Sequence, residues 1–229
     1  DKILSITQKL FEYCRSNHWA GYDPYDALNS KLLKFLPLLD FRLPRLAMTQ
    51  IMKRSPINFR PLLLIPKRQN PKALALFLAA FLKLSQKDQF KCGNNISMMV
   101  ESIKALRSPD MPYWCWGYSF PWQGRSVLTP QGEPNLICTV FVANALLDAY
   151  EKAGHGEYLT MATSAAEYVL NELYWEDHKN AGFSYPLPSL RVQVHNANFL
   201  GAALLCRIYQ QTGYTKFLEP ALKASRHSA

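Results

Sequence analysis

Apolar residues recur at helical spacing along most of the chain. Between residues 157 and 173, apolar and polar residues separate into two opposite stripes, which is the pattern of an amphipathic helix. The apolar stripe consists of Leu159, Ala162, Ala166, Val169 and Leu173. Residues 199–209 are instead apolar almost all round, which predicts a helix packed on several sides.

The same periodicity predicts further helices along the chain. Their expected ranges are 2–16, 24–39, 43–52, 72–84, 96–107 and 217–225. Four prolines, at positions 56, 61, 66 and 71, predict an extended connector before the helix at 72–84, because proline interrupts helical hydrogen bonding.

The helical pattern repeats within the chain. Residues 136–159 align with residues 195–218 at an offset of 59, which pairs Tyr150 with Tyr209 and Gly154 with Gly213. At an offset of 68 a third copy lies upstream, and its matching residues are Ala75, Leu78, Leu82 and Phe90. Each copy predicts a helical hairpin, with an apolar first helix, a short turn and a second helix that opens with an aromatic residue.

Apolar helices that alternate with amphipathic ones are typical of an α-solenoid or of an (α/α) toroid. The repeat spacings of 59 and 68 residues exceed the roughly 34 to 47 of common solenoids, and the surplus lies in loops at 109–134 and 175–194. The sequence therefore predicts one all-α domain over residues 1–229, an incomplete (α/α)6 toroid. Six hairpins need well over about 300 residues, so we expect the later hairpins to be missing from this chain.

Composition narrows the class of protein. With 48% hydrophobic, 13% aromatic and 19% charged residues, the chain is neither a disordered tail nor a coiled-coil rod. Its longest apolar runs fall short of the roughly 18 residues that span a bilayer, so no transmembrane segment is expected. Five cysteines without a C-x-x-C pair predict neither a disulfide framework nor a zinc site. We therefore expect a reducing, cytoplasmic location and no cofactor or metal; any targeting segment is absent or already lost.

The net charge of +9 is unevenly distributed. Residues 1–110 hold 18 Lys and Arg against 8 Asp and Glu, whereas residues 111–229 hold 8 against 9. The basic residues are spread among Leu and Pro instead of forming one stripe, so no nucleic-acid partner is expected. The alternatives are an anionic membrane surface, an acidic saccharide and a solvated basic face.

Five stretches of sequence carry a family resemblance. They are Trp-Ala-Gly-Tyr-Asp-Pro-Tyr-Asp-Ala-Leu at 19–28, Asn-Phe-Arg-Pro-Leu-Leu at 58–63, Asn-Pro-Lys-Ala-Leu-Ala-Leu-Phe at 70–77, Trp-Cys-Trp-Gly-Tyr-Ser-Phe-Pro-Trp-Gln at 114–123 and Val-His-Asn-Ala-Asn-Phe-Leu-Gly-Ala at 194–202. In these stretches the chain resembles a six-hairpin glycosidase-like family associated with bacterial exopolysaccharide and lipopolysaccharide biosynthesis. The resemblance implies an (α/α) toroid, a glycan ligand and polysaccharide-assembly enzymes as candidate partners. The Gly-Ser-Trp and Asp-Asn-Phe-His-Thr-type motifs that usually follow in the family do not occur here.

Six aromatic residues within ten positions form the strongest local signal. They are Tyr113, Trp114, Trp116, Tyr118, Phe120 and Trp122. Flat aromatic faces suit the apolar faces of pyranose rings, so the loop is a candidate saccharide platform. The alternative is a hydrophobic clasp that closes the end of the toroid.

Two acidic residues, Asp23 and Asp26, flank the predicted start of the helix at 24–39. Either can serve as a helix cap, or as a sugar ligand or general acid/base beside Trp19 and Tyr22. Glycoside hydrolysis needs two carboxyl groups. Glu133, before another expected helix, is the candidate partner of Asp23, with capping again as the alternative.

Three further residues complete the candidate site. His195 and Asn198 lie where a hairpin helix begins, and His195 is a candidate ligand of a sugar hydroxyl. Arg125 follows the aromatic run and either pairs with an anionic saccharide or stacks on Trp122. The leading hypothesis is a glycoside hydrolase-like or lyase-like protein that binds a glycan in an aromatic-lined cleft. The alternative is a non-catalytic scaffold whose basic first half binds acidic partners or a membrane surface.

Overall fold

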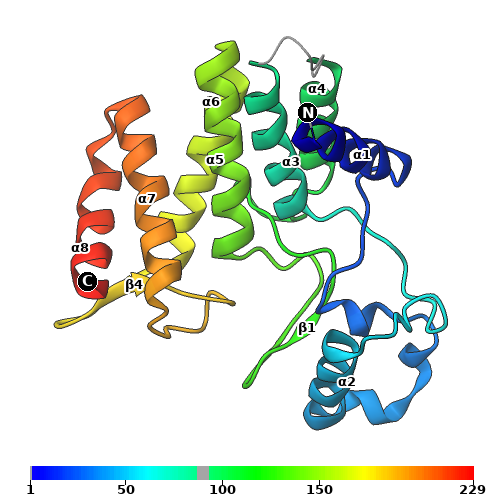
Figure 1. Ribbon diagram of the computed structural model, residues 1–229. Helices are drawn as coiled ribbons and strands as arrows, with labels where there is room; N and C mark the ends of the chain where they lie inside the picture. Colours follow the sequence, from blue (N-terminus) through cyan, green and yellow to red (C-terminus); the bar gives the residue numbers. More distant parts are fainter. Residues whose placement is uncertain (1, 87–92) are drawn as a thin grey trace. The chain divides into compact units, whose positions relative to one another are not determined.

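The computed structural model describes residues 2–86 and 93–229, without the side chains of residues 34, 38, 40 and 93. The chain is predominantly helical, as the all-α prediction requires (Figure 1). Two short two-stranded antiparallel sheets complete the regular structure of the described part. The toroid itself stays a prediction.

The chain separates into two compact units. Unit 1 comprises Asp1–Asn70 and Ser119–Gln131, and unit 2 comprises Pro71–Tyr118 and Gly132–Ala229. The aromatic loop expected at 109–134 is thus divided between the two. That the two units form one domain stays a prediction.

Unit 2 consists of the three predicted helical hairpins. They are α3 (Pro71–Leu84) with α4 (Gly93–Ala105), α5 (Leu136–Ala153) with α6 (Gly156–Tyr168), and α7 (His195–Thr212) with α8 (Leu218–Ser228). Within each hairpin the two helices pack together, and α5 packs on both α3 and α7 (Figure 1). The internal repeat therefore predicted the hairpins correctly, although Phe90, in the third copy, lies outside the described residues.

Two glycines end the first helices of the second and third hairpins. Gly154 has φ +71° after α5, and Gly213 has φ +72° after α7. Glycine adopts this left-handed conformation without the steric cost that a Cβ brings, which is why it commonly follows a helix. The two residues that the repeat aligns thus perform the same structural task.

Several helix boundaries differ by a few residues from the expectation, as α4 shows, which spans Gly93–Ala105 where 96–107 is expected. The helix predicted at 157–173 is α-helical to Tyr168 and continues as the π-helical turn Val169–Leu173. The last predicted helix begins with the short 3-10 turn Thr215–Phe217 before α8. Among the described residues, no helix is both long and apolar enough to cross a bilayer.

Unit 1 has two α-helices, α1 (Lys2–Ser16) and α2 (Arg42–Arg54), in its described part. Its core contains Ala27, Met52 and Ile65, with Tyr22 and Phe59 among the residues packed against them. Residues 119–131 add the ribbon of β1 (Trp122–Gln123) and β2 (Leu128–Thr129), and β1 packs on α2. Unit 2 contains the second two-stranded ribbon, in which β3 (Tyr174–Glu176) pairs with β4 (Ala181–Phe183).

The helix predicted at 24–39 is wrong. The segment forms three 3-10 turns instead: Asp26–Asn29, Leu33–Phe35 and Pro37–Asp40. Ser30 is extended at the end of the first turn, and its hydroxyl lies 2.6 Å from the carbonyl oxygen of Leu63. Leu36 is extended because it precedes Pro37, which disfavours helical geometry at that position.

Candidate functional site

Trp122 and Thr129 lie directly opposite each other in the β1–β2 ladder. Cross-strand partners project their side chains from the same face of a ribbon, with Cβ atoms about 5 Å apart. The Trp122 indole Nε1 and the Thr129 hydroxyl Oγ1 are both buried, and neither has a hydrogen-bond partner among the described residues. Thr129 is 1% exposed. We call this pair the Trp122–Thr129 site.

An unmade hydrogen bond in a buried place is unfavourable, at about 1–3 kcal/mol for each group. Three other buried side-chain nitrogens in the described part share this condition, those of Asn135, Trp175 and Gln193. At the Trp122–Thr129 site, however, a donor and a hydroxyl that can donate or accept stand on paired residues. Their pairing suits a ligand that has adjacent hydroxyl groups.

Tyr25 and Lys53 extend this site within unit 1. The Tyr25 and Trp122 ring centroids are 6.3 Å apart at an interplanar angle of 61°, an edge-to-face arrangement. The Lys53 ammonium donates to the Tyr25 hydroxyl at 2.5 Å and lies 4.4 Å from the centre of the same ring. The half-buried indole of Trp122 thus has an aromatic neighbour, which in turn holds a cation.

Arginine side chains add positive charge to the same unit. Arg45 donates from Nε to the Gln123 Oε1 at 2.8 Å, next to Trp122 in β1, and Arg125 is exposed in the β1–β2 turn. By sequence, unit 1 has 13 Lys and Arg against 5 Asp and Glu, a balance of +8. Nearly all of the net charge of the chain therefore belongs to unit 1.

Asp23 and Asp26 occupy structural positions. The Asp26 carboxylate accepts from Arg60 Nε at 2.8 Å and from the Asp23 backbone N–H at 3.0 Å, and Asp26 is 3% exposed. One oxygen of Asp23 accepts the backbone N–H of Tyr25 at 2.9 Å. The expected helix caps are not formed, because no helix begins at residue 24 and the 3-10 turn Asp26–Asn29 has no side-chain cap. The Asp26 carboxylate is instead paired with Arg60, and its role as a sugar ligand stays a prediction.

Trp19 and Tyr22 also serve the interior of unit 1. Trp19 is 6% exposed, and its ring meets that of Phe11 edge-on at 5.6 Å. The Arg60 guanidinium lies 5.6 Å from the centre of the Tyr22 ring, and the Lys67 ammonium lies 5.7 Å from the same centre. Trp19 is thus largely buried and Tyr22 half-buried, and their substrate-binding role beside Asp23 stays a prediction.

Trp116, in unit 2, is a core residue and not part of a saccharide platform. It is fully buried, and its Nε1 donates to the carbonyl oxygen of Ile103 at 2.8 Å. Its backbone N–H donates to the Thr139 hydroxyl at 3.1 Å. A ring without exposed surface cannot stack on a sugar, so Trp116 serves the core of unit 2.

Trp114 and Tyr118 are half-buried in unit 2. The Arg107 guanidinium lies 4.8 Å from the centre of the Trp114 ring, whose centroid is 6.1 Å from that of Trp116. The backbone carbonyl of Tyr118 accepts the N–H of Gly132 at 2.8 Å. The Arg107 guanidinium therefore makes a cation–π contact with Trp114.

Asn198 is a second correction in unit 2. It is fully buried, accepts the Phe183 backbone N–H at 2.9 Å, and donates to the Ser228 hydroxyl at 2.9 Å. Its carboxamide therefore ties α7 to β4 and α8. His195, by contrast, is exposed at the first residue of α7.

Glu133 is half-buried before α5, in unit 2. Burial raises the pKa of the Tyr168 phenol, and the nearby carboxylates of Glu133 and Glu172 raise it further. The predicted acid pair of Asp23 and Glu133 is divided between the two units, so its separation stays untested. Among the described residues, no group of three or more His, Cys, Asp or Glu side chains could hold a metal ion.

The structure thus gathers part of the predicted set in unit 1. Tyr22, Asp23, Trp122 and Arg125 belong to it, together with the buried Trp19 and Asp26. Sequence reasoning missed Tyr25, Lys53 and Thr129. Comparison of the chain with protein-family models, curated proteins and solved structures gives no match.

Proposed function

We propose that this protein binds a carbohydrate at the Trp122–Thr129 site. A sugar ring offers apolar C–H faces that stack on an indole, and hydroxyl groups that donate and accept hydrogen bonds. The observation that carries the proposal is the pair of buried polar atoms on facing residues, Trp122 Nε1 and Thr129 Oγ1, without partners in the described part of the chain.

The charge of unit 1 supports an acidic saccharide as the ligand. Lys53 contacts Tyr25, Arg45 contacts Gln123, and Arg125 is exposed in the turn between the two strands. A uronic acid or another anionic sugar brings a carboxylate to this basic surface, and the attraction weakens as salt screens it. The resemblance to a polysaccharide-biosynthesis family is consistent with such a ligand.

The proposal concerns binding of the sugar. Catalysis requires further groups. Hydrolysis requires two carboxyl groups about 5 to 9.5 Å apart. In unit 1, Asp26 is engaged by Arg60, and Asp23 accepts a backbone N–H of its own turn. A glycoside hydrolase-like or lyase-like reaction at this site therefore needs an acid outside this pair.

Calorimetric titration tests the proposal. Oligosaccharides of uronic acids and their neutral counterparts are titrated into the wild type, Trp122→Phe and Thr129→Val. We expect the acidic series to bind more tightly, and each variant to lose about tenfold in affinity, in line with one hydrogen bond. Trp114→Phe is the matched control, because Arg107 already covers that ring. Equal affinity in all four proteins, or no binding by either series, contradicts the proposal.

A further inference from the structure

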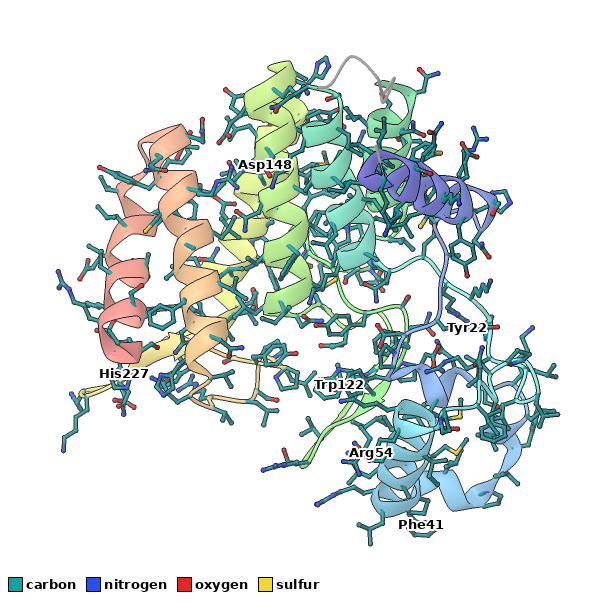
Figure 2. All side chains as sticks on the ribbon, in the orientation of Figure 1. Tyr22, Phe41, Arg54, Trp122, Asp148 and His227 are labelled. Carbon is teal, nitrogen blue, oxygen red and sulfur yellow. The ribbon has the colours of Figure 1, made fainter. Side chains whose placement is uncertain are left out.

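Several large apolar side chains are exposed on α2 and in the segment that precedes it in unit 1. Phe35 is 86% exposed, Phe41 66%, Leu43 73% and Ile51 58%. Phe41 directly precedes α2 and Arg54 ends it (Figure 2). We call Phe35, Phe41, Leu43 and Ile51 the α2 apolar surface.

Helical spacing explains why Leu43 and Ile51 face outward. Leu43, Ala47 and Ile51 follow one another at a spacing of four and are all exposed, so they form one stripe. Thr49 and Met52 lie on the other side and are buried, Met52 in the core of unit 1. Within the described part of unit 1, the helix therefore has a core-facing side and an exposed apolar side.

Basic residues flank this apolar surface along the sequence. Lys31 precedes it, Arg42 lies between Phe41 and Leu43, and Arg54 ends the helix; all three are exposed. Unit 1 as a whole carries a balance of +8. Exposed aromatic and aliphatic side chains flanked by Lys and Arg are typical of helices that lie in the interface of an anionic membrane.

We propose that the α2 apolar surface docks on the surface of an anionic lipid bilayer. Its apolar side chains enter the boundary between headgroups and acyl chains, while Lys31, Arg42 and Arg54 contact the lipid phosphates. The charge argues for this occupant over a second copy of the chain, because two surfaces of the same strongly basic unit repel each other. The inference is independent of the carbohydrate site.

Vesicle flotation with the full chain tests the inference. Phosphatidylcholine vesicles with and without phosphatidylglycerol are compared at low and high salt. We expect binding only to vesicles with the anionic lipid, and weaker binding at high salt. Changing both Phe35 and Phe41 to Ser should lower the affinity by at least about tenfold, because each phenyl group contributes apolar area to the bound state. Arg42→Gln with Arg54→Gln should reduce both the affinity and its salt dependence.

Two controls keep the result interpretable. Phe199→Ser removes an aromatic ring that is 44% exposed on α7 and should leave binding unchanged. Phe41→Trp keeps an interfacial aromatic and should retain binding, which separates a loss of contact from a loss of fold. No binding to anionic vesicles at low salt overturns the proposal. So does a dimer in sedimentation that dissociates when Phe35 and Phe41 become Ser, because the occupant would then be a second copy.

Discussion

Arg60 holds the carboxylate of Asp26 at 2.8 Å, with 13% of the arginine side chain and 4% of the aspartate side chain exposed. The same guanidinium donates from a second nitrogen to the carbonyl oxygen of Asp23 at 2.8 Å. This contact joins the 3-10 turn at Asp26–Asn29 to the connector after α2. It is the most deeply buried ion pair of unit 1 in the described residues.

Removing Arg60 should destabilise unit 1. Arg60→Met leaves the Asp26 carboxylate buried without its partner, which typically costs about 3–5 kcal/mol. Hydrogen exchange read by mass spectrometry should show faster exchange in peptides of residues 20–65 and unchanged exchange in α5 and α7. Arg15→Met is the control, since its pair with Glu12 is exposed. Equal effects of the two substitutions would mean that burial of the Arg60 pair does not matter.

Thr129→Val should stabilise the protein without ligand. The hydroxyl is buried and has no partner within the described chain, and valine keeps the shape of the side chain without a polar atom. We expect a rise of about 0.5–1 kcal/mol in the free energy of unfolding, together with the loss of saccharide affinity. Urea unfolding measures the first effect. A destabilised Val variant would indicate that Thr129 Oγ1 has a structural partner, such as a bound water.

Gly117→Ala should destabilise unit 2. A Cβ at Gly117 would overlap the backbone carbonyl of Glu133, where residues 117 and 134 form an antiparallel bridge. Backbone shifts of this kind cost about 1–3 kcal/mol, or several degrees in Tm. Thermal unfolding compares this variant with Gly156→Ala, because a Cβ at Gly156 meets no heavy atom within 4 Å. A Tm for Gly117→Ala equal to that of the control would contradict the close approach.

The buried cysteines should resist alkylation in the folded protein. Burial raises the pKa of both the Cys115 and the Cys138 thiol to about 12, so few thiolates form at pH 8. In a Cys92→Ser background, which removes the cysteine outside the described residues, iodoacetamide should label Cys14 and Cys206 first. Peptide mapping measures the order, and early labelling of Cys138 would contradict its burial.

The raised pKa values of these two thiols make the free energy of unfolding depend on pH. Between about pH 9 and pH 12 the unfolded thiols lose protons that the folded thiols keep. The free energy of unfolding should therefore fall as pH rises through this range, and these thiols should contribute no slope below it. The change is measured by comparing urea unfolding midpoints at pH 7.5 and at pH 10. The second pH is about one unit above the pKa of the unfolded thiols. A higher midpoint at pH 10 would be the wrong sign for this account.

Local periodicity and the internal repeat predicted most of unit 2. Aligning Gly154 with Gly213 identified the turns of two hairpins, because a left-handed residue after a helix leaves a mark in the sequence. The segment 24–39 has the same apolar spacing as a helix but folds as 3-10 turns. Leu36 is extended before Pro37, and Ser30 contacts Leu63, 33 residues away; periodicity shows neither feature.

The candidate site was harder to predict than the hairpins. A run of alternating aromatics does not tell which rings face inward, so Trp116 and Trp122 looked alike in the sequence although Trp116 is a core residue. Thr129 became a candidate only through its register opposite Trp122, a tertiary relationship. Residues 195–198 marked the start of α7, but the Asn198 side chain is used to hold α7 against β4 and α8.

The most direct test of carbohydrate binding observes the Trp122 indole N–H itself. In a ¹⁵N-labelled sample, the tryptophan side-chain signals are assigned with Trp122→Phe and Trp116→Phe, and an acidic oligosaccharide is titrated in. The account predicts that the Trp122 signal shifts as its free N–H gains an acceptor, while the Trp116 signal, already bonded to Ile103, stays in place. A Trp122 signal that does not move at saturating sugar would contradict it.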